Sequence, residues 1–240
     1  MEELLKKIKA KGYWKIVIRP NKYIGNLIPS VQECKKMIEN NKLELRGWDY
    51  PHIDVGGIKI SSDNSVYSYC DWPEGPMYEC WRFYQTGQFV HYFAMREDLR
   101  ISDLRKKELQ DEFGNKIEKF LDILSTLYSV TEIYQFASKL FSNLNIEGAE
   151  ITIELYDVKE RMLIFLGSFD RYLSKSYVCE FDGVLSVGKE KIITKKELIE
   201  NYNELALEAT IEIFTKFNWD SVNKSIFIED QKKFLERRVL

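Results

Sequence analysis

The chain has 240 residues, of which 45% are hydrophobic and 30% are charged, a composition typical of a folded globular protein rather than a disordered one. Its formal net charge of −3 at pH 7 excludes an overall positive field that would attract nucleic acid or an anionic membrane. The best candidate for membrane insertion, residues 162–167, is far shorter than the roughly 18 apolar residues of a spanning helix, so we expect no membrane association.

The N-terminal segment alternates helix and strand signals. Residues 2–11 carry apolar side chains at helical spacing and 13–18 form a β-branched run, which predicts a helix followed by a strand. Ser30 is the predicted cap of a second helix, which runs to Asn41, and residues 43–46 resume as a strand.

Residues 47–95 are expected to form an antiparallel sheet. Short extended pieces alternate here with turn residues such as Gly56-Gly57 and Asp63-Asn64. The last two pieces, within 78–95, flank Thr86-Gly87 and therefore predict a β-hairpin.

A domain boundary is predicted after this sheet. Residues 96–114 are strongly charged with few apolar anchors, and Gly114-Asn115 provides a break, so we expect two domains, 1–98 and 115–240. The second domain is predicted to contain helices 116–128 and 132–144, the latter capped by Thr131, then strands 149–158, 161–169 and 177–187, and helices 195–217 and 228–238. The fold class is α+β, with an antiparallel, aromatic-rich hairpin in the N-terminal half and helices plus a small antiparallel sheet in the C-terminal half.

The hairpin is the most prominent candidate for a binding site. Ten aromatic residues lie within 67–93. A two-residue turn would place Arg82 opposite His91 on one face and Trp81 opposite Tyr92 on the other. Because both faces then carry aromatic rings, the second face must meet another layer of the protein, a partner or a ligand, and we expect Trp81 or Tyr92 at such an interface. A core that covers both faces is the alternative.

A second candidate is the loop RGWDYPHID, residues 46–54, which combines charged and aromatic side chains around a proline. Its Trp48, Asp49 and His52 are candidate binding residues, because loops held on a sheet often carry function. The alternative is a structural turn in which Asp49 or Asp54 caps backbone donors.

No catalytic or cofactor-binding motif is visible. The chain lacks GxxxxGK[ST] and GxGxxG loops, so we expect no cofactor. Cys70, Cys80 and His91 lack the paired spacing of zinc ligands, so we expect ordinary buried thiols and no metal. The acidic strand 150–157 resembles the carboxylate set of a metal-dependent nuclease, but alternation on a half-exposed strand explains it as well. Four cysteines without a CxxC pair, and no apolar signal region at the start, indicate a reducing cytoplasm.

Several stretches carry a resemblance that would cover most of the chain. RGWDYPHI, ECWRFYQTGQFVHYF, STLYSVTEIYQFASKL, ELALEATIEIFTKFNWD and EDQKKFLERR resemble a largely uncharacterised prokaryotic family of hypothetical proteins. Similar regions accompany DNA-binding domains of the Schlafen/AlbA type, although no motif of that domain is present here. The resemblance implies an accessory or sensing role in a larger assembly and no catalytic residue.

These observations favour a non-catalytic interaction or sensor module that binds a protein partner or a small ligand through the hairpin and the 47–54 loop. The first alternative is an enzyme that acts on an anionic small molecule, with a site assembled from Arg82, His91, His52 and Asp49. The second is binding of single-stranded nucleic acid by stacking on the hairpin, which is disfavoured because the hairpin supplies too few cations to follow a phosphate backbone.

Overall fold

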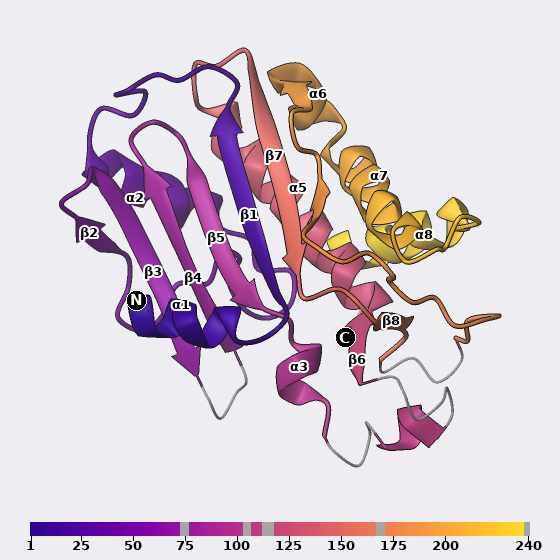
Figure 1. Ribbon diagram of the computed structural model, residues 1–240. Coiled ribbons are helices and arrows are strands. Elements are labelled where there is room, and N and C mark those ends of the chain that lie inside the picture. The colour runs from indigo at the N-terminus through magenta and orange to yellow at the C-terminus, as the bar shows by residue number, and fades with distance from the viewer. Residues whose placement is uncertain (73–76, 103–106, 112–117, 167–170, 238–240) are drawn as a thin grey trace.

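The computed structural model describes residues 1–72, 77–102, 107–111, 118–166 and 171–237. Its main feature is an eight-stranded antiparallel sheet in the order β10-β7-β1-β5-β4-β3-β2, with β9 paired to β7 (Figure 1). The strands are β1 (Tyr13–Pro20), β2 (Lys59–Ser61), β3 (Ser65–Trp72), β4 (Met77–Tyr84), β5 (Phe89–Ala94), β7 (Gly148–Tyr156), β9 (Leu185–Val187) and β10 (Ile192–Thr194). The α+β class is confirmed.

β1 joins the two halves of the chain. It pairs with β5 along one edge and with β7 along the other, so strands from the predicted domains 1–98 and 115–240 share one sheet. One hydrophobic core also draws residues from both halves, for example Ile16 and Ile153. The structure therefore differs from the two-domain prediction. The reason is that the backbone N–H and C=O groups along both edges of β1 are paired, and the second partner strand comes from beyond the charged stretch 96–114.

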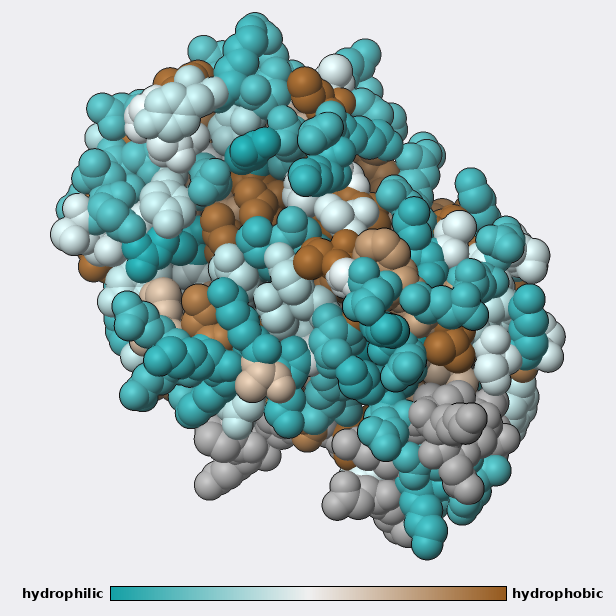
Figure 2. Space-filling view, in the orientation of Figure 1, coloured by the Kyte–Doolittle hydropathy of each residue, from teal (hydrophilic) through white to brown (hydrophobic). Residues whose placement is uncertain are grey.

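The helices cover the two faces of the sheet unequally. They are α1 (Glu2–Lys9), α2 (Val31–Asn41), α3 (Glu97–Arg100), α5 (Ile123–Ser142), α6 (Lys195–Glu200), α7 (Tyr202–Thr215) and α8 (Lys224–Leu235). α2 and α5 lie on the inner face, with α7 and α8 packed beyond α5, whereas the short α1 crosses the opposite, open face (Figure 1). On the side shown in Figure 2, hydrophobic residues show only in small groups between hydrophilic ones.

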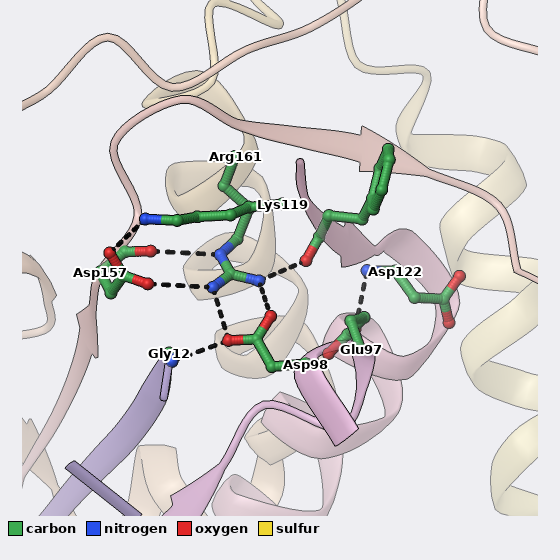
Figure 3. A network of polar contacts seen from close by, with 8 residues as sticks. Gly12, Glu97, Asp98, Lys119, Asp122, Asp157 and Arg161 are labelled. Carbon is green, nitrogen blue, oxygen red and sulfur yellow. Dashed lines mark hydrogen bonds and ion pairs between the residues drawn. The ribbon is translucent and has the colours of Figure 1, made fainter. Parts of the chain in front are cut away.

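A second, two-stranded sheet lies beside the first. β6 (Lys119–Asp122) and β8 (Arg161–Ile164) pair in parallel, and the buried Arg161 ties them to the main sheet. Its guanidinium donates to Asp98 in a bidentate pair at 2.7 and 2.9 Å, and to the carbonyl oxygen of Phe120 at 2.6 Å (Figure 3). Asp98 also accepts from the amide of Gly12 at 2.7 Å, so one ion pair connects α3, β8 and the start of β1.

Most helices and strands of the N-terminal half are confirmed. α1, β1 and α2 occupy the predicted positions, and the amide of Glu33 donates to the Ser30 hydroxyl as expected of a cap. The predicted strand 43–46 is wrong, because only a single bridge joins Leu43 to Tyr50.

The C-terminal half differs more. Residues 119–122 form a strand, and the two predicted helices 116–128 and 132–144 are one helix, α5, capped by Asp122. Thr131 lies in its interior, where the hydroxyl donates to the carbonyl oxygen of Leu127 and needs no cap position. The predicted boundary Gly114-Asn115 lies outside the described residues.

The hairpin turn between β4 and β5 holds three residues rather than two. The amide of Tyr84 donates to the carbonyl oxygen of Gln88, and that of Gly87 donates to Tyr84, each at 2.9 Å. Gly87 has φ of +80°, the left-handed conformation that closes a three-residue hairpin loop and suits glycine.

This turn shifts the register by one residue. Trp81 pairs with His91, and Cys80 pairs with Tyr92. The predicted pairings of Arg82 with His91 and of Trp81 with Tyr92 are therefore wrong, because a one-residue shift moves a side chain to the other face of the sheet. Trp81 and His91 both face the helices, while Arg82 and Tyr92 lie on the open face.

Candidate ligand-binding pocket

A pocket lies between the inner face of the sheet and the start of α5. Its cavity volume is about 40 Å³, within a hollow of about 520 Å³ that includes the open mouth. The lining comes from β1 (Trp14), the 47–54 loop (Trp48, Asp49, Tyr50), β4 and β5 (Glu79, His91, Phe93, Ala94), the start of α3 (Arg96, Glu97) and α5 (Ser125, Thr126, Ser129, Glu132). Segments far apart in the sequence thus converge on one small site.

Buried polar atoms without a partner concentrate here. Among the described residues, nine buried side-chain nitrogen or oxygen atoms lack a hydrogen-bond partner, and five of them belong to residues that line this pocket. They are Tyr50 Oη, His91 Nδ1, His91 Nε2, Thr126 Oγ1 and Glu132 Oε1. Because an unpaired buried polar group costs about 1–3 kcal/mol, such a concentration is typical of a site that pairs with a bound molecule or with water.

Three glutamates give the pocket an acidic interior. Burial raises the pKa of Glu79 to about 7, an effect that the nearby Arg96 partly offsets. Burial likewise raises the pKa of Glu97 to about 7 and raises that of Glu132. Glu79 and Glu97 form no ion pair with a lysine or arginine in the described part of the chain, whereas Glu132 accepts from Arg46 at 3.0 Å.

His91 and Tyr50 add neutral hydrogen-bonding groups. Burial, together with the nearby His52, lowers the pKa of His91 to about 3, so the imidazole is neutral at physiological pH. Its Nε2 lies 3.9 Å from Glu79 Oε1. Burial also raises the pKa of Tyr50, which keeps the phenol protonated. A neutral imidazole and a phenol each offer a donor and an acceptor to whatever occupies the pocket.

Arg96 and Trp48 form one wall of the pocket, and Arg46 lies beside this wall, outside the lining. The Arg96 guanidinium lies 4.6 Å from the ring centroid of Trp48. Arg46 lies over the rings of Tyr128 and Phe234 and also donates to Ser129 at 3.1 Å. A second hollow, lined in part by Arg46, Trp48 and Arg96, continues from this wall toward α8.

The structure brings together part of the predicted site. Trp48, Asp49 and His91 all line the pocket, with Asp49 paired to Lys42 at 3.0 Å. His52 lies behind it: its amide donates to Glu79 at 3.1 Å, and its imidazole pKa is lowered by burial.

The other three predicted residues lie elsewhere. Trp81 is 1% exposed and belongs to the core, so its expected place at an interface is wrong. Arg82 pairs with Asp63 on the open face, and its guanidinium lies 5.4 Å from the ring centroid of Tyr67. Tyr92 is also on the open face, under Lys9 at 5.7 Å. The predicted enzyme site therefore does not assemble, because Arg82 and His91 are separated by the sheet.

Sequence reasoning found Asp49 but missed the three glutamates of the pocket. Glu79 shares a strand face with Trp81 and Phe83, and an acid among buried aromatics is itself a signal of a polar interior site. Glu132 lies between Val130 and Ile133 on a helix that is buried over most of its surface. The sequence around Glu79 or Glu132 does not indicate which residues of other segments lie next to that glutamate in the fold.

Two cations of β1 on the open face pair with carboxylates of β7. Lys15 pairs with Glu154 at 2.8 Å, and Arg19 pairs with Glu150 at 2.7 Å. No group of three or more potential metal ligands occurs within the described residues. Across that same part of the chain, no helix is both long and apolar enough to cross a membrane.

Comparisons with protein-family models, with curated proteins and with solved structures found no match to this chain.

Proposed function

We propose that this protein is a small-molecule-binding module, with its ligand site in the pocket between β4, β5 and α5. The observation that carries the proposal is that five buried, unpartnered polar atoms belong to residues that line one cavity. Native proteins rarely leave such atoms unpaired, and a ligand that pairs with several of them gains both affinity and specificity.

The site favours a small ligand over a protein partner. The concave pocket is built mainly from buried side chains, and the aromatic ring expected at a protein interface, Trp81, is in the core. Single-stranded nucleic acid is also disfavoured, because Lys15, Arg19 and Arg82 on the open face are occupied by carboxylates.

The test is a fragment screen by ligand-observed NMR on the full chain. The blocking variant is Trp48→Ala, which removes one wall of the pocket, and the matched control is Trp72→Ala, an exposed tryptophan that does not line it. We expect fragments that bind the wild type and Trp72→Ala but lose saturable binding to Trp48→Ala. Fragments that bind all three proteins equally, or no binding to the wild type, would overturn the proposal.

A second candidate function is acid–base catalysis in the same pocket. Glu79, with its pKa near 7, lies beside the unpaired His91 and Tyr50, and a group with a pKa near the working pH is suited to proton transfer. Chemical conversion of a bound fragment by the wild type, lost in Glu79→Gln while binding persists, would establish an enzyme. If the fragments are chemically unchanged after prolonged incubation, catalysis is contradicted and ligand binding is the function that remains.

A further inference from the structure

Resting on the proposed function, we propose that the pocket binds a small organic cation, with an ammonium group placed between Glu79 and Glu132 and its carbon substituent packed against Trp48 and Phe93. The charge of the lining is the first reason. Four of the lining residues are acidic (Asp49, Glu79, Glu97 and Glu132). One lining residue, Arg96, is a cation. Asp49 and Glu132 have cationic partners outside the lining, Lys42 and Arg46, which leaves Glu79 and Glu97 without an ion pair to a lysine or arginine among the described residues.

Of these two glutamates, Glu79 is the better ligand group. Glu97 Oε1 accepts from the amide of Asp122 at 2.8 Å, and this bond holds it against the start of α5 (Figure 3). Glu79 Oε1 accepts from His52, while its other oxygen makes no hydrogen bond within the described part of the chain. Glu132 Oε1 is also unpaired and buried, its side chain lines the same pocket, and its charge raises the pKa of Glu79. A cation between them relieves this repulsion.

Hydrogen-bond chemistry is the second reason. An ammonium group offers up to three donors and no acceptor, which matches an interior rich in acceptors. Glu132 Oε1 and the lone-pair nitrogen of the neutral His91 have no partner, and the oxygens of Tyr50 and Thr126 can accept as well. An anion or a carbonyl group could accept from the hydroxyls and the imidazole N–H, but it would face the carboxylates of Glu79 and Glu132 with acceptors of its own.

The rings and the size of the pocket are the third reason. Aromatic faces attract cations by roughly 0.5–2 kcal/mol, and Trp14, Trp48, Tyr50 and Phe93 all contribute to the lining. The cavity volume of about 40 Å³ is large enough for a group the size of a water molecule. That space suits a compact ammonium head with its substituent directed to the mouth.

The test uses three probes of similar shape: benzylammonium, benzyl alcohol and benzoate. Each is titrated at pH 8 into the full chain and followed by the ring signals of His91 and Trp48 in NMR spectra. We expect benzylammonium to bind at least tenfold more tightly than the other two. Glu79→Gln should lower the benzylammonium affinity at least tenfold and leave benzyl alcohol unchanged, while the control Glu154→Gln, on the open face, should change neither.

A second measurement, on the wild type, stands even if Glu79→Gln folds poorly. Because a cation prefers the ionised carboxylate of Glu79, the affinity for benzylammonium should rise about tenfold from pH 6 to pH 8. The titratable or charged groups that face Glu79 are His91 from β5, Cys70 from β3, Glu132 from α5, Arg96, and His52 and Tyr50 from the loop.

The outcomes separate this inference from the function on which it rests. Equal or tighter binding of benzyl alcohol or benzoate, abolished by Trp48→Ala, would overturn the cation and leave the ligand pocket intact. If none of the three probes binds, the proposal of an organic cation as ligand is overturned. The fragment screen then tests independently whether the pocket binds another small molecule. Tight benzylammonium binding that is unaffected by both Glu79→Gln and pH would place the cation elsewhere and also overturn the inference.

Discussion

The indole Nε1 of Trp81 donates a 2.6 Å hydrogen bond to the carbonyl oxygen of His52, and the amide of the same histidine donates to Glu79 at 3.1 Å. Two side chains of β4 on one face therefore hold one residue of the 47–54 loop. This clamp positions the loop residues Trp48, Asp49 and Tyr50 along the pocket. The aromatic hairpin thus contributes to the candidate site by supporting its wall rather than by exposing its rings.

Replacing Trp81 tests this supporting role. Because the indole is 1% exposed, Trp81→Ala should lower the free energy of unfolding by about 3–5 kcal/mol, measured by urea denaturation. Trp72→Ala, at a tryptophan that is 53% exposed, should change it by less than about 0.5 kcal/mol. If the Trp81→Ala protein is as stable as the wild type, this prediction is contradicted, and Trp81 is an exposed residue rather than a core residue.

Glu79 should make stability depend on pH in a definite direction. Since its pKa is raised to about 7 in the folded protein, the folded state binds a proton more tightly than the unfolded chain, and the resulting stability is lost as pH rises through 7. Relative to Glu79→Gln, the wild type should therefore gain on the order of 2–3 kcal/mol between pH 8 and pH 5. His91 contributes the opposite trend in both proteins, because burial lowers its pKa.

Urea denaturation of wild type and Glu79→Gln at pH 5, 6, 7 and 8 measures this difference. A stability difference that stays constant over the series would show that Glu79 titrates at its ordinary pKa and is solvated.

Arg161 should be the most sensitive charged residue in the chain. Its side chain is fully buried, so Arg161→Met leaves Asp98 without its bidentate partner and should cost about 3–5 kcal/mol. Lys119→Met is the matched control from the same network, because Lys119 pairs with Asp157 at a partly exposed position and should cost less than about 1 kcal/mol. Thermal unfolding by circular dichroism distinguishes the two, and equal effects would mean that the Arg161 pair is solvated.

Alanine substitutions at two glycines distinguish the cost of backbone strain from the cost of steric contact. Gly57 and Gly87 both have positive φ, so alanine at either position should cost about 1 kcal/mol. A Cβ at Gly57 would meet nothing within 4 Å, whereas one at Gly87 would lie 2.9 Å from Leu27 Cδ2 and 3.0 Å from Pro20 Cγ. Gly87→Ala should therefore be clearly more destabilising than Gly57→Ala in urea denaturation. Equal costs would show that Leu27 and Pro20 move aside freely.

Local patterns predicted the N-terminal elements because these elements are defined by neighbouring residues. Ser30 caps α2 through a contact three residues away, and β1 begins directly after Gly12, just beyond the end of α1. The hairpin register was missed because it depends on one backbone conformation, that of Gly87, which the pair Thr86-Gly87 does not specify. A one-residue difference there moved Arg82 away from His91.

The pocket could be predicted only in part for a similar reason. Trp48, Asp49 and His91 belong to segments whose composition is unusual in itself. Glu132 becomes part of the same site only because α5 crosses behind β4 and β5, and periodicity within a helix carries no information on which strand it meets. The family resemblance stays a prediction.

The central position of β1 also decides how this chain behaves when it is cut. A break in the charged stretch 96–114 would leave β1 bonded to β5 but stripped of β7, and would leave β7 without β1. Each fragment would then expose a long strand edge without hydrogen-bond partners, and the other fragment carries the strand that pairs with this edge. Co-expressed halves should assemble into one complex, whereas either half alone should aggregate. The stretch 96–114 is therefore a suitable place to divide this protein for a split reporter.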